Sequence, residues 1–330
     1  MKGGMTVRSK MMAWMSVVML LGPQWLTGSA AAGAAEVAGV ITEIHVGQGQ
    51  AEVRRAGSQD WRPVRPLLTL NAGDTVRVGL DASVVILLNG HRGSVTVDAT
   101  HSPFEVLAPP AERGTLGRGW VLLEESFKAL LKASDDSGQV TLGSRGGGRP
   151  PTILTPRNGP VLPDALVFEW VGSRSSRYTI RVVGPSGLVL ERKHVAGTTF
   201  AYPADAVPLA PGVRYEFQVI TAGKLPEKAW FEVADPVRAA TIRQDLAELA
   251  AAAGPVVSPN TLVATQVAYL TSQGLLVDAR LTLVAALANQ ADDVTMHVLL
   301  GDLYARLGLP ELAAESFDEA RFLSRSRSQR

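Results

Sequence analysis

The chain has 330 residues, of which 46% are hydrophobic and 19% charged, and its 32 Lys and Arg nearly balance its 31 Asp and Glu. This length and composition predict a folded protein of two or three domains, because one domain usually holds roughly 150 residues. The net charge of +1 excludes a general attraction to nucleic acid or acidic membranes. The absence of cysteine excludes disulfides, thiolate metal clusters, cysteine nucleophiles and a lipid-modified cysteine.

The N-terminal segment has the pattern of a secretory signal peptide. Basic residues precede an uncharged apolar run, Met11–Gly22, which is too short to span a bilayer. Small residues follow and offer A-x-A-like cleavage sites. We therefore expect residues 1–35 to be a signal peptide, the remainder to be periplasmic or secreted in a bacterial envelope, and no integral membrane span to persist after cleavage. The alternative is that Trp14–Leu26 stays uncleaved as an anchor.

Residues 36–108 predict a small all-β domain, because apolar residues occur there in short runs separated by turn residues. Val84–Leu88 is an apolar, β-branched run that ends in Asn89-Gly90, a pair that favours a tight hairpin turn. The next expected strand is Ser94–Asp98, in which valines alternate with polar residues, so that one face is buried and the other is wet.

Short motifs across nearly all of this segment point to one known family. They are Val40-Ile41, Val46-Gly47, Ala51–Arg55, Trp61–Val64, and Leu70–Arg77 with its Gly73-Asp74-Thr75 step. In these residues the segment resembles the FecR domain family. The resemblance implies an exported β-domain that binds something; the best-known members sense an outer-membrane receptor and control a sigma factor through a cytoplasmic segment. Only ten residues precede the apolar run, so we expect no such cytoplasmic segment here.

Residues 109–151 are rich in Gly, Pro and Ser and predict a linker that ends in a glycine-rich hinge, Gly146–Pro151. The linker contains one amphipathic helix, between Trp120 and Ala133, with an apolar face made of Leu123, Phe127, Leu130 and Leu131. Acidic and basic residues cancel elsewhere on this helix, which disfavours binding to a membrane surface. We expect the helix to pack against a neighbouring domain.

Residues 152–236 predict a β-sandwich of about six strands. The expected strands include Val167–Val171, Tyr178–Val183, Leu188–Leu190, Arg214–Ile220 and Trp230–Val233, with clear alternation in the second and fourth. Three features carry a resemblance to fibronectin type III or immunoglobulin-like modules of bacterial exported proteins: the opening Leu154–Gly159, the turn Leu209–Tyr215, and Trp170, which would be the core tryptophan.

Residues 237–330 predict a helical domain, which begins with Asp235 as an N-cap before Pro236. Two units then align with a period of 34 residues, which pairs Gly274 with Gly308, Ala279 with Ala313, Leu283 with Phe317, and Ala286 with Ala320. This period is typical of tetratricopeptide repeats, which are antiparallel helix pairs that bind peptides and proteins. The second unit follows the family pattern, whereas Gln266 and Val267 replace the expected Leu and Gly in the first.

Residues with chemical potential do not form a recognisable constellation. The histidines, His45, His91, His101, His194 and His297, lack metal-ligand spacing. Gly184–Gly187 lacks the spacing of a nucleophile elbow, and Gly146–Gly148 leads into prolines rather than a phosphate-binding helix. The pairs Asp135-Asp136 and Asp292-Asp293, and the tail with Arg321, Arg325, Arg327 and Arg330, have structural or solvated explanations. We predict no catalytic, cofactor-binding or metal-binding residue, no cofactor and no enzyme activity.

The fold class we expect is a multidomain β plus α protein of independent surfaces joined by flexible segments. The expected function is a non-enzymatic periplasmic scaffold or adaptor that binds an envelope protein or peptide through its helical repeats, and not nucleic acid. One alternative is binding to peptidoglycan or another envelope polysaccharide, in which Trp61, Arg62 and Arg65 stack on sugars. Another alternative is a periplasmic component of a FecR-type signal-sensing system.

Overall fold

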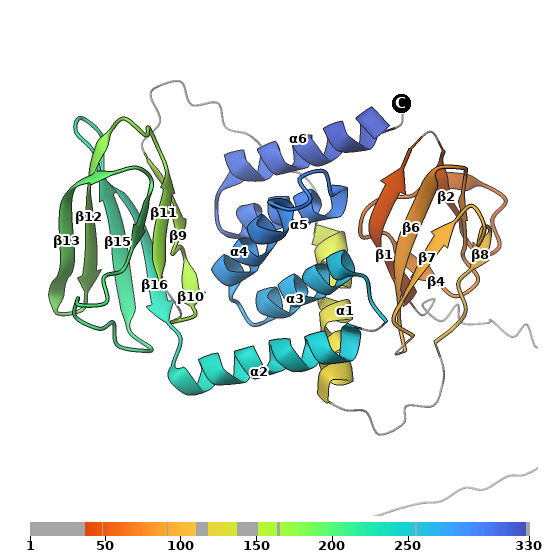
Figure 1. The fold of residues 1–330 in the computed structure, drawn as a ribbon, viewed down its shortest axis with the longest axis horizontal. Helices are drawn as coiled ribbons and strands as arrows, with labels where there is room; N and C mark the ends of the chain where they lie inside the picture. Colours follow the sequence, from red (N-terminus) through yellow and green to blue (C-terminus); the bar gives the residue numbers. More distant parts are fainter. Residues whose placement is uncertain are drawn as a thin grey trace, which may run out of the picture. The chain divides into compact units, whose positions relative to one another are not determined.

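The computed structural model describes residues 37–109, 118–136 and 151–327, apart from residues 48, 91, 164, 165 and 255. The predicted signal peptide and the glycine-rich stretch before Pro151 lie outside the described residues. The described part mixes mostly antiparallel sheets with helices, which predominate after residue 235 (Figure 1). Among the helices it contains, none has both the length and the apolar character needed to span a membrane.

The first β region consists of two four-stranded sheets with one shared cluster of buried side chains. One sheet has the order β4-β1-β6-β7, with bounds Thr69–Asn71, Val37–Val46, Ala82–Leu88 and Ser94–Asp98. The other has the order β3-β2-β5-β8, with bounds Trp61–Pro63, Ala51–Arg54, Thr75–Val78 and Phe104–Glu105. The strands expected at 84–88 and 94–98 are confirmed, although β6 begins earlier than expected.

Asp74 explains why the Gly-Asp-Thr step precedes β5. Its carboxylate is almost fully buried and accepts hydrogen bonds from the backbone N–H groups of Ala56 and Asn71, each at 2.9 Å. Arg55 Nη1 also donates to it at 2.6 Å. Gly73 supplies the positive φ of the turn, at 83°. One carboxylate therefore joins two turns of this region.

The β6–β7 hairpin differs from the tight turn expected at Asn89-Gly90. Leu87 pairs with Ser94, so the connection spans the six residues between them. Asn89 is held by β1 instead of by the turn: its backbone N–H donates to Ala38 O at 2.9 Å, and Nδ2 donates to Val37 O at 3.1 Å. These bonds extend the pairing with β1 and force a longer loop.

The second β region contains a five-stranded and a three-stranded sheet. The five-stranded order is β10-β16-β15-β12-β13, with bounds Gly159–Val161, Glu227–Val233, Arg214–Ile220, Arg177–Gly184 and Gly187–Ala196. The three-stranded order is β14-β11-β9, with bounds Thr199–Ala201, Val167–Val171 and Thr152–Thr155. All five expected strands are present, and β13 continues well beyond Leu190.

Aromatic side chains fill the core of this second region. Trp170 is only 1% exposed, which confirms its expected core position, and its ring lies 5.3 Å from that of Tyr178 in an edge-on contact. Phe168 and Phe217 lie 4.5 Å apart between ring centroids. The alternating apolar residues of β12 and β15 are all buried, as their pattern predicts.

The helical part contains five helices after α1 (Arg118–Asp136). Their bounds are α2 Pro236–Ala253, α3 Pro259–Ser272, α4 Leu276–Leu287, α5 Val294–Arg306 and α6 Pro310–Arg327. The predicted N-cap is confirmed, since Asp235 accepts a hydrogen bond from Arg238 N at 2.9 Å and Pro236 begins the helix.

The connections α3–α4 and α5–α6 are built alike, 34 residues apart. Gly274 and Gly308 have φ of 75° and 73°. Each of the backbone bonds Gln273 N→Tyr269 O, Gly274 N→Thr271 O, Leu275 N→Leu270 O and Ala279 N→Leu275 O has a counterpart at Leu307 N→Leu303 O, Gly308 N→Ala305 O, Leu309 N→Tyr304 O and Ala313 N→Leu309 O. The sequence period is thus a structural period.

The two units differ where the first departs from the family pattern. A Cβ built on Gly301 would lie 2.6 Å from the ring of Phe317, so a side chain at 301 needs a smaller partner. The first unit has Val267 and Leu283 at the corresponding positions, and both are buried. A larger residue on one helix is therefore matched by a smaller one on the next.

One continuous cluster of buried side chains runs through most of the described chain. It includes Val40 and Leu87 of the first β region, Trp170 of the second and the helices α2 to α5. The predicted amphipathic helix is confirmed as α1: its Leu123, Phe127 and Leu130 are buried in this cluster, and it contacts α2 and α3. The expectation of independent surfaces is therefore wrong, because this helix packs into the core instead of lying free in a linker.

Candidate interaction surface

Helix α4 directs its only two charged side chains inward. Arg280 is 3% exposed, and its Nη1 donates to Glu169 Oε2 on β11 at 2.8 Å and to Thr155 Oγ1 on β9 at 3.3 Å. Burial lowers the pKa of Arg280, but the hydrogen bond and charge of Glu169, together with Tyr304, outweigh it and leave that pKa above its ordinary value. Asp278 accepts a hydrogen bond from Leu162 N beside β10. The polar face of α4 is therefore used to hold the second β region.

The outer side of α4 is apolar. Leu281 is 42% exposed and Val284 38% exposed, and Ala285 and Ala288 are exposed as well. Their spacing of i, i+3, i+4 and i+7 places them along one face of the helix. We call these four residues the α4 stripe. An exposed apolar line of this kind on a helix that is otherwise well packed is typical of a binding surface.

The second unit shows what these positions normally carry. The residues 34 positions after the α4 stripe are Glu315, Asp318, Glu319 and Phe322 of α6, and all four are exposed. The repeat therefore exposes these positions in both units, and α6 fills three of the four with acidic side chains. The apolar character of the α4 stripe is a property of its residues and not of its location.

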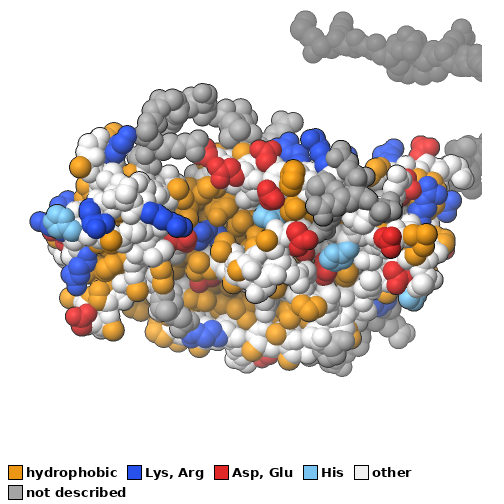
Figure 2. Space-filling model, turned by 45° about the horizontal axis from the view of Figure 1, so that its top comes forward, with side chains coloured by type: hydrophobic (Ala, Val, Ile, Leu, Met, Phe, Trp, Pro, Cys, Tyr) orange, Lys and Arg blue, Asp and Glu red, His pale blue; other side chains and the backbone are white. Residues whose placement is uncertain are grey.

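Strand β11 adds apolar side chains beside α4. Val167 and Val171 lie on the same face of the strand as Glu169 and are 39% and 47% exposed. The Arg280–Glu169 ion pair is thus flanked by exposed apolar residues from both elements. Figure 2 shows hydrophobic side chains gathered between the second β region and the helices, with acidic side chains along one border.

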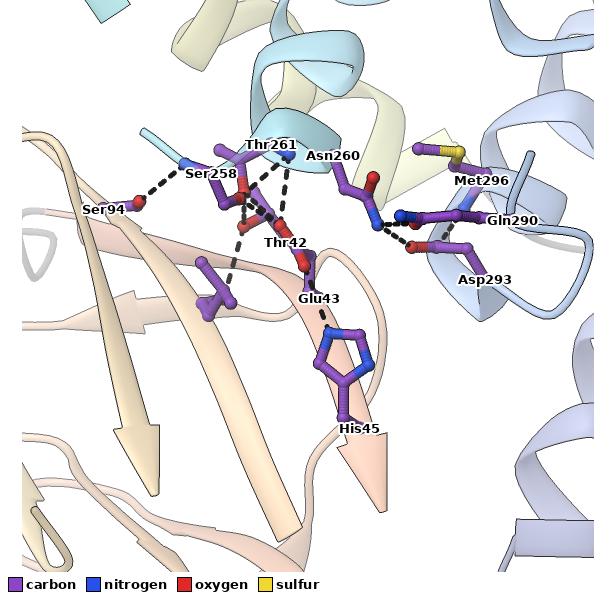
Figure 3. A network of polar contacts seen from close by, with 11 residues as sticks. Thr42, Glu43, His45, Ser94, Ser258, Asn260, Thr261, Gln290, Asp293 and Met296 are labelled. Carbon is purple, nitrogen blue, oxygen red and sulfur yellow. Dashed lines mark hydrogen bonds and ion pairs between the residues drawn. The ribbon is translucent and has the colours of Figure 1, made fainter. Parts of the chain in front are cut away.

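A second polar cluster, not foreseen from the sequence, joins β1 to α3 (Figure 3). Glu43 is 5% exposed, and its Oε1 accepts hydrogen bonds from Ser258 Oγ, from Thr261 N at 3.2 Å and from Thr261 Oγ1 at 3.0 Å. His45 Nε2 lies 3.1 Å from the other carboxylate oxygen. Thr42 Oγ1 also bonds with Thr261 Oγ1 at 2.7 Å. Glu43 therefore caps the N-terminus of α3 from another element.

This cluster contains opposed pKa shifts. Burial raises the pKa of Glu43, but hydrogen bonds from His45, Ser258 and Thr261 outweigh burial, so that the pKa lies below its ordinary value. Burial and the charge of Glu43 raise the pKa of Asp293, the N-cap of α5, against its bond from Met296 N. The residues have structural roles, and the only sequence signal was a carboxylate within the apolar strand β1.

The histidines and other residues weighed from the sequence lie apart from one another. His45 contacts Glu43, His101 contacts Asp98, and His297 contacts Ala291 O. Over the described ranges, no three His, Asp or Glu side chains form a group that could hold a metal ion. His91, the side chains of Asp135 and Asp136, and those of Arg327 and Arg330 lie outside the described residues.

Two further candidates have local roles. Gly184–Gly187 closes the β12–β13 hairpin, as expected from its place between strands. The ring of Trp61 lies under two guanidinium groups, with Arg77 Cζ at 4.0 Å and Arg54 Cζ at 5.1 Å from its centroid. A sugar stacking on this ring would compete with those arginines. Arg62 and Arg65 are exposed.

Comparison with known proteins adds no family to this description. No family model matches the chain, and no curated protein matches it. The three family resemblances therefore stay predictions.

Proposed function

We propose that this chain is an exported, non-enzymatic scaffold that binds a protein partner on its helical repeats. The α4 stripe is the observation that carries this proposal, because it leaves apolar side chains uncovered where the following unit has acids. In this proposal the first β region is FecR-like, the second is a fibronectin or immunoglobulin-like sandwich, and α3–α6 are tetratricopeptide-like repeats. The matching hydrogen bonds of the two helix connections support the last assignment.

The partner we propose is an amphipathic helix with basic residues beside its apolar face. The α4 stripe is one helix wide and about 10 Å long at 1.5 Å per residue, which suits a single docked helix. It is too small for the roughly 800 Å² per partner that a stable dimer of this chain needs. The acidic residues of α6 favour Lys or Arg at the border of the docked helix.

The test is partner recovery with the full tagged chain and with Leu281→Glu and Val284→Glu. Burying one such side chain contributes about 1.5–3 kcal/mol, so each substitution should reduce recovery of the specific partner at least tenfold. Leu225→Glu is the matched control, because Leu225 is 85% exposed and lies far along the chain from α4. Equal recovery with all three variants would show that the α4 stripe does not bind the partner.

A further inference from the structure

A groove distinct from the α4 stripe opens where the first β region meets the ends of α5 and α6. Its volume is about 760 Å³, which lies within the range of roughly 300–1,000 Å³ of ligand sites. Its walls come from the end of β1, from β2, from the segment after β3, and from the first residue of α5 and the last turns of α6.

The lining is mainly aliphatic. Ile44 and Val46 of β1, Val64 after β3 and Val294 of α5 contribute apolar surface, and two prolines flank the Val64-Arg65 pair. Ile44, Val46 and Val64 are only partly buried, so a ligand in the groove would cover them. Each covered side chain would favour binding through the loss of apolar surface from water.

Two arginines from different parts of the chain also line the groove. Arg65 belongs to the first β region and Arg325 to α6, and both are exposed. In the part of the chain that the structure describes, neither guanidinium has an ion-pair partner within 4.0 Å. Two like charges on one groove repel each other, and an anionic ligand between them would relieve that repulsion.

The acidic groups near the groove are already engaged. Glu52, which lines it, pairs with Arg77 at 2.7 Å. Glu43 bonds with His45 and with the N-terminal turn of α3, and Asp293 caps α5. The two guanidinium groups therefore remain as the uncompensated charges of the lining.

We propose that this groove binds a short, extended, acidic peptide segment of a partner protein. In an extended chain successive side chains point to opposite sides, so one set can cover the aliphatic lining while carboxylates on the other reach Arg65 and Arg325. An anionic polysaccharide fits less well, because no aromatic ring lines the groove to stack on sugars. This site is separate from the α4 stripe and does not depend on the function proposed for it.

The experiment measures fluorescence anisotropy of a labelled octapeptide of alternating Glu and Val with the full chain. Peptides of alternating Lys and Val, and of alternating Glu and Gly, test the charge and the apolar side chains separately, and a labelled oligogalacturonate tests the polysaccharide. We expect the Glu-Val peptide to bind best and to weaken as salt rises. Arg65→Glu and Arg325→Glu should each weaken binding at least tenfold, with Arg65→Lys retaining part of it.

Arg174→Glu is the matched control, because Arg174 is exposed on the second β region and makes the same change in net charge. Circular dichroism of each variant checks that the fold is kept. The proposal is overturned if Arg174→Glu weakens binding as much as Arg65→Glu does, if the Lys-Val or Glu-Gly peptide binds as well as the Glu-Val peptide, or if only the oligogalacturonate depends on Arg65.

Discussion

Two buried charges join the helices to the two β regions, and their surroundings differ. Glu43 accepts several hydrogen bonds from the first turn of α3, where backbone donors and the helix dipole favour a negative charge. Arg280 lies in the middle of α4, and its charge is balanced by Glu169 alone. The first charge is stabilised by many small contributions and the second by one partner, so the two junctions should respond differently to substitution.

The largest effect should follow from removing Arg280. Arg280→Ala leaves Glu169 without its cation and leaves space where a nearly fully buried side chain stood. Breaking a buried pair by removing one partner costs about 3–5 kcal/mol. Urea unfolding measures this loss, and the exposed Arg174→Ala should change stability by less than about 0.5 kcal/mol. A loss below about 1 kcal/mol for Arg280→Ala would mean that α4 does not depend on the ion pair.

A smaller effect, with a defined pH dependence, should follow from Glu43→Gln. Hydrogen bonds to a charged group contribute about 1.5–3 kcal/mol, and we expect a loss of about 2 kcal/mol at pH 7. The pKa of Glu43 in the fold lies below its value of 4.5 in the unfolded chain. The stabilisation is therefore complete above pH 4.5 and disappears as pH falls through the folded pKa.

Urea unfolding of wild type and Glu43→Gln from pH 7 to pH 3 checks this prediction. The difference between the two proteins should shrink as the solution becomes acidic. Glu105→Gln, on the exposed strand β8, provides a control with the same change of charge. A difference that grows on acidification would contradict the assignment.

The smallest effect should come from Asp293→Asn. Asparagine also caps helices well, and the substitution removes a buried negative charge near Glu43. Because the folded pKa of Asp293 is raised, its ionised form destabilises the fold at neutral pH, and this cost is relieved as pH falls through the folded pKa. We expect a gain of under about 1 kcal/mol at pH 7 that vanishes below pH 3.8 in the same unfolding series. Asp205→Asn in an exposed loop should show no such gain.

The elements with strong local patterns were predictable. Alternation located β12 and β15, the Asp-Pro pair located the start of α2, and the 34-residue period located the two equivalent glycine turns. These features depend on residues close together in the sequence. They therefore do not require knowledge of which elements meet.

The remaining features depend on contacts between distant residues. Asn89 lengthens its hairpin because it bonds to β1, and Glu43 is buried because α3 supplies donors more than 200 residues later. The exposed face of α4 was not predictable either, because this helix is apolar on nearly all sides and has no periodicity that separates inside from outside. Its orientation follows from the position of Glu169 on β11.

The shared cluster of buried residues bears on how the chain would come apart. Because α1 contributes to the same interior as α2, α3 and both β regions, no boundary can be cut without exposing apolar side chains to water. Deleting α2–α6 would strip Leu123, Phe127 and Leu130 of their neighbours, so a shortened protein that lost its partner might simply have become sticky. Heating should melt this assembly in one cooperative step, and proteases should find few nicking sites between its regions.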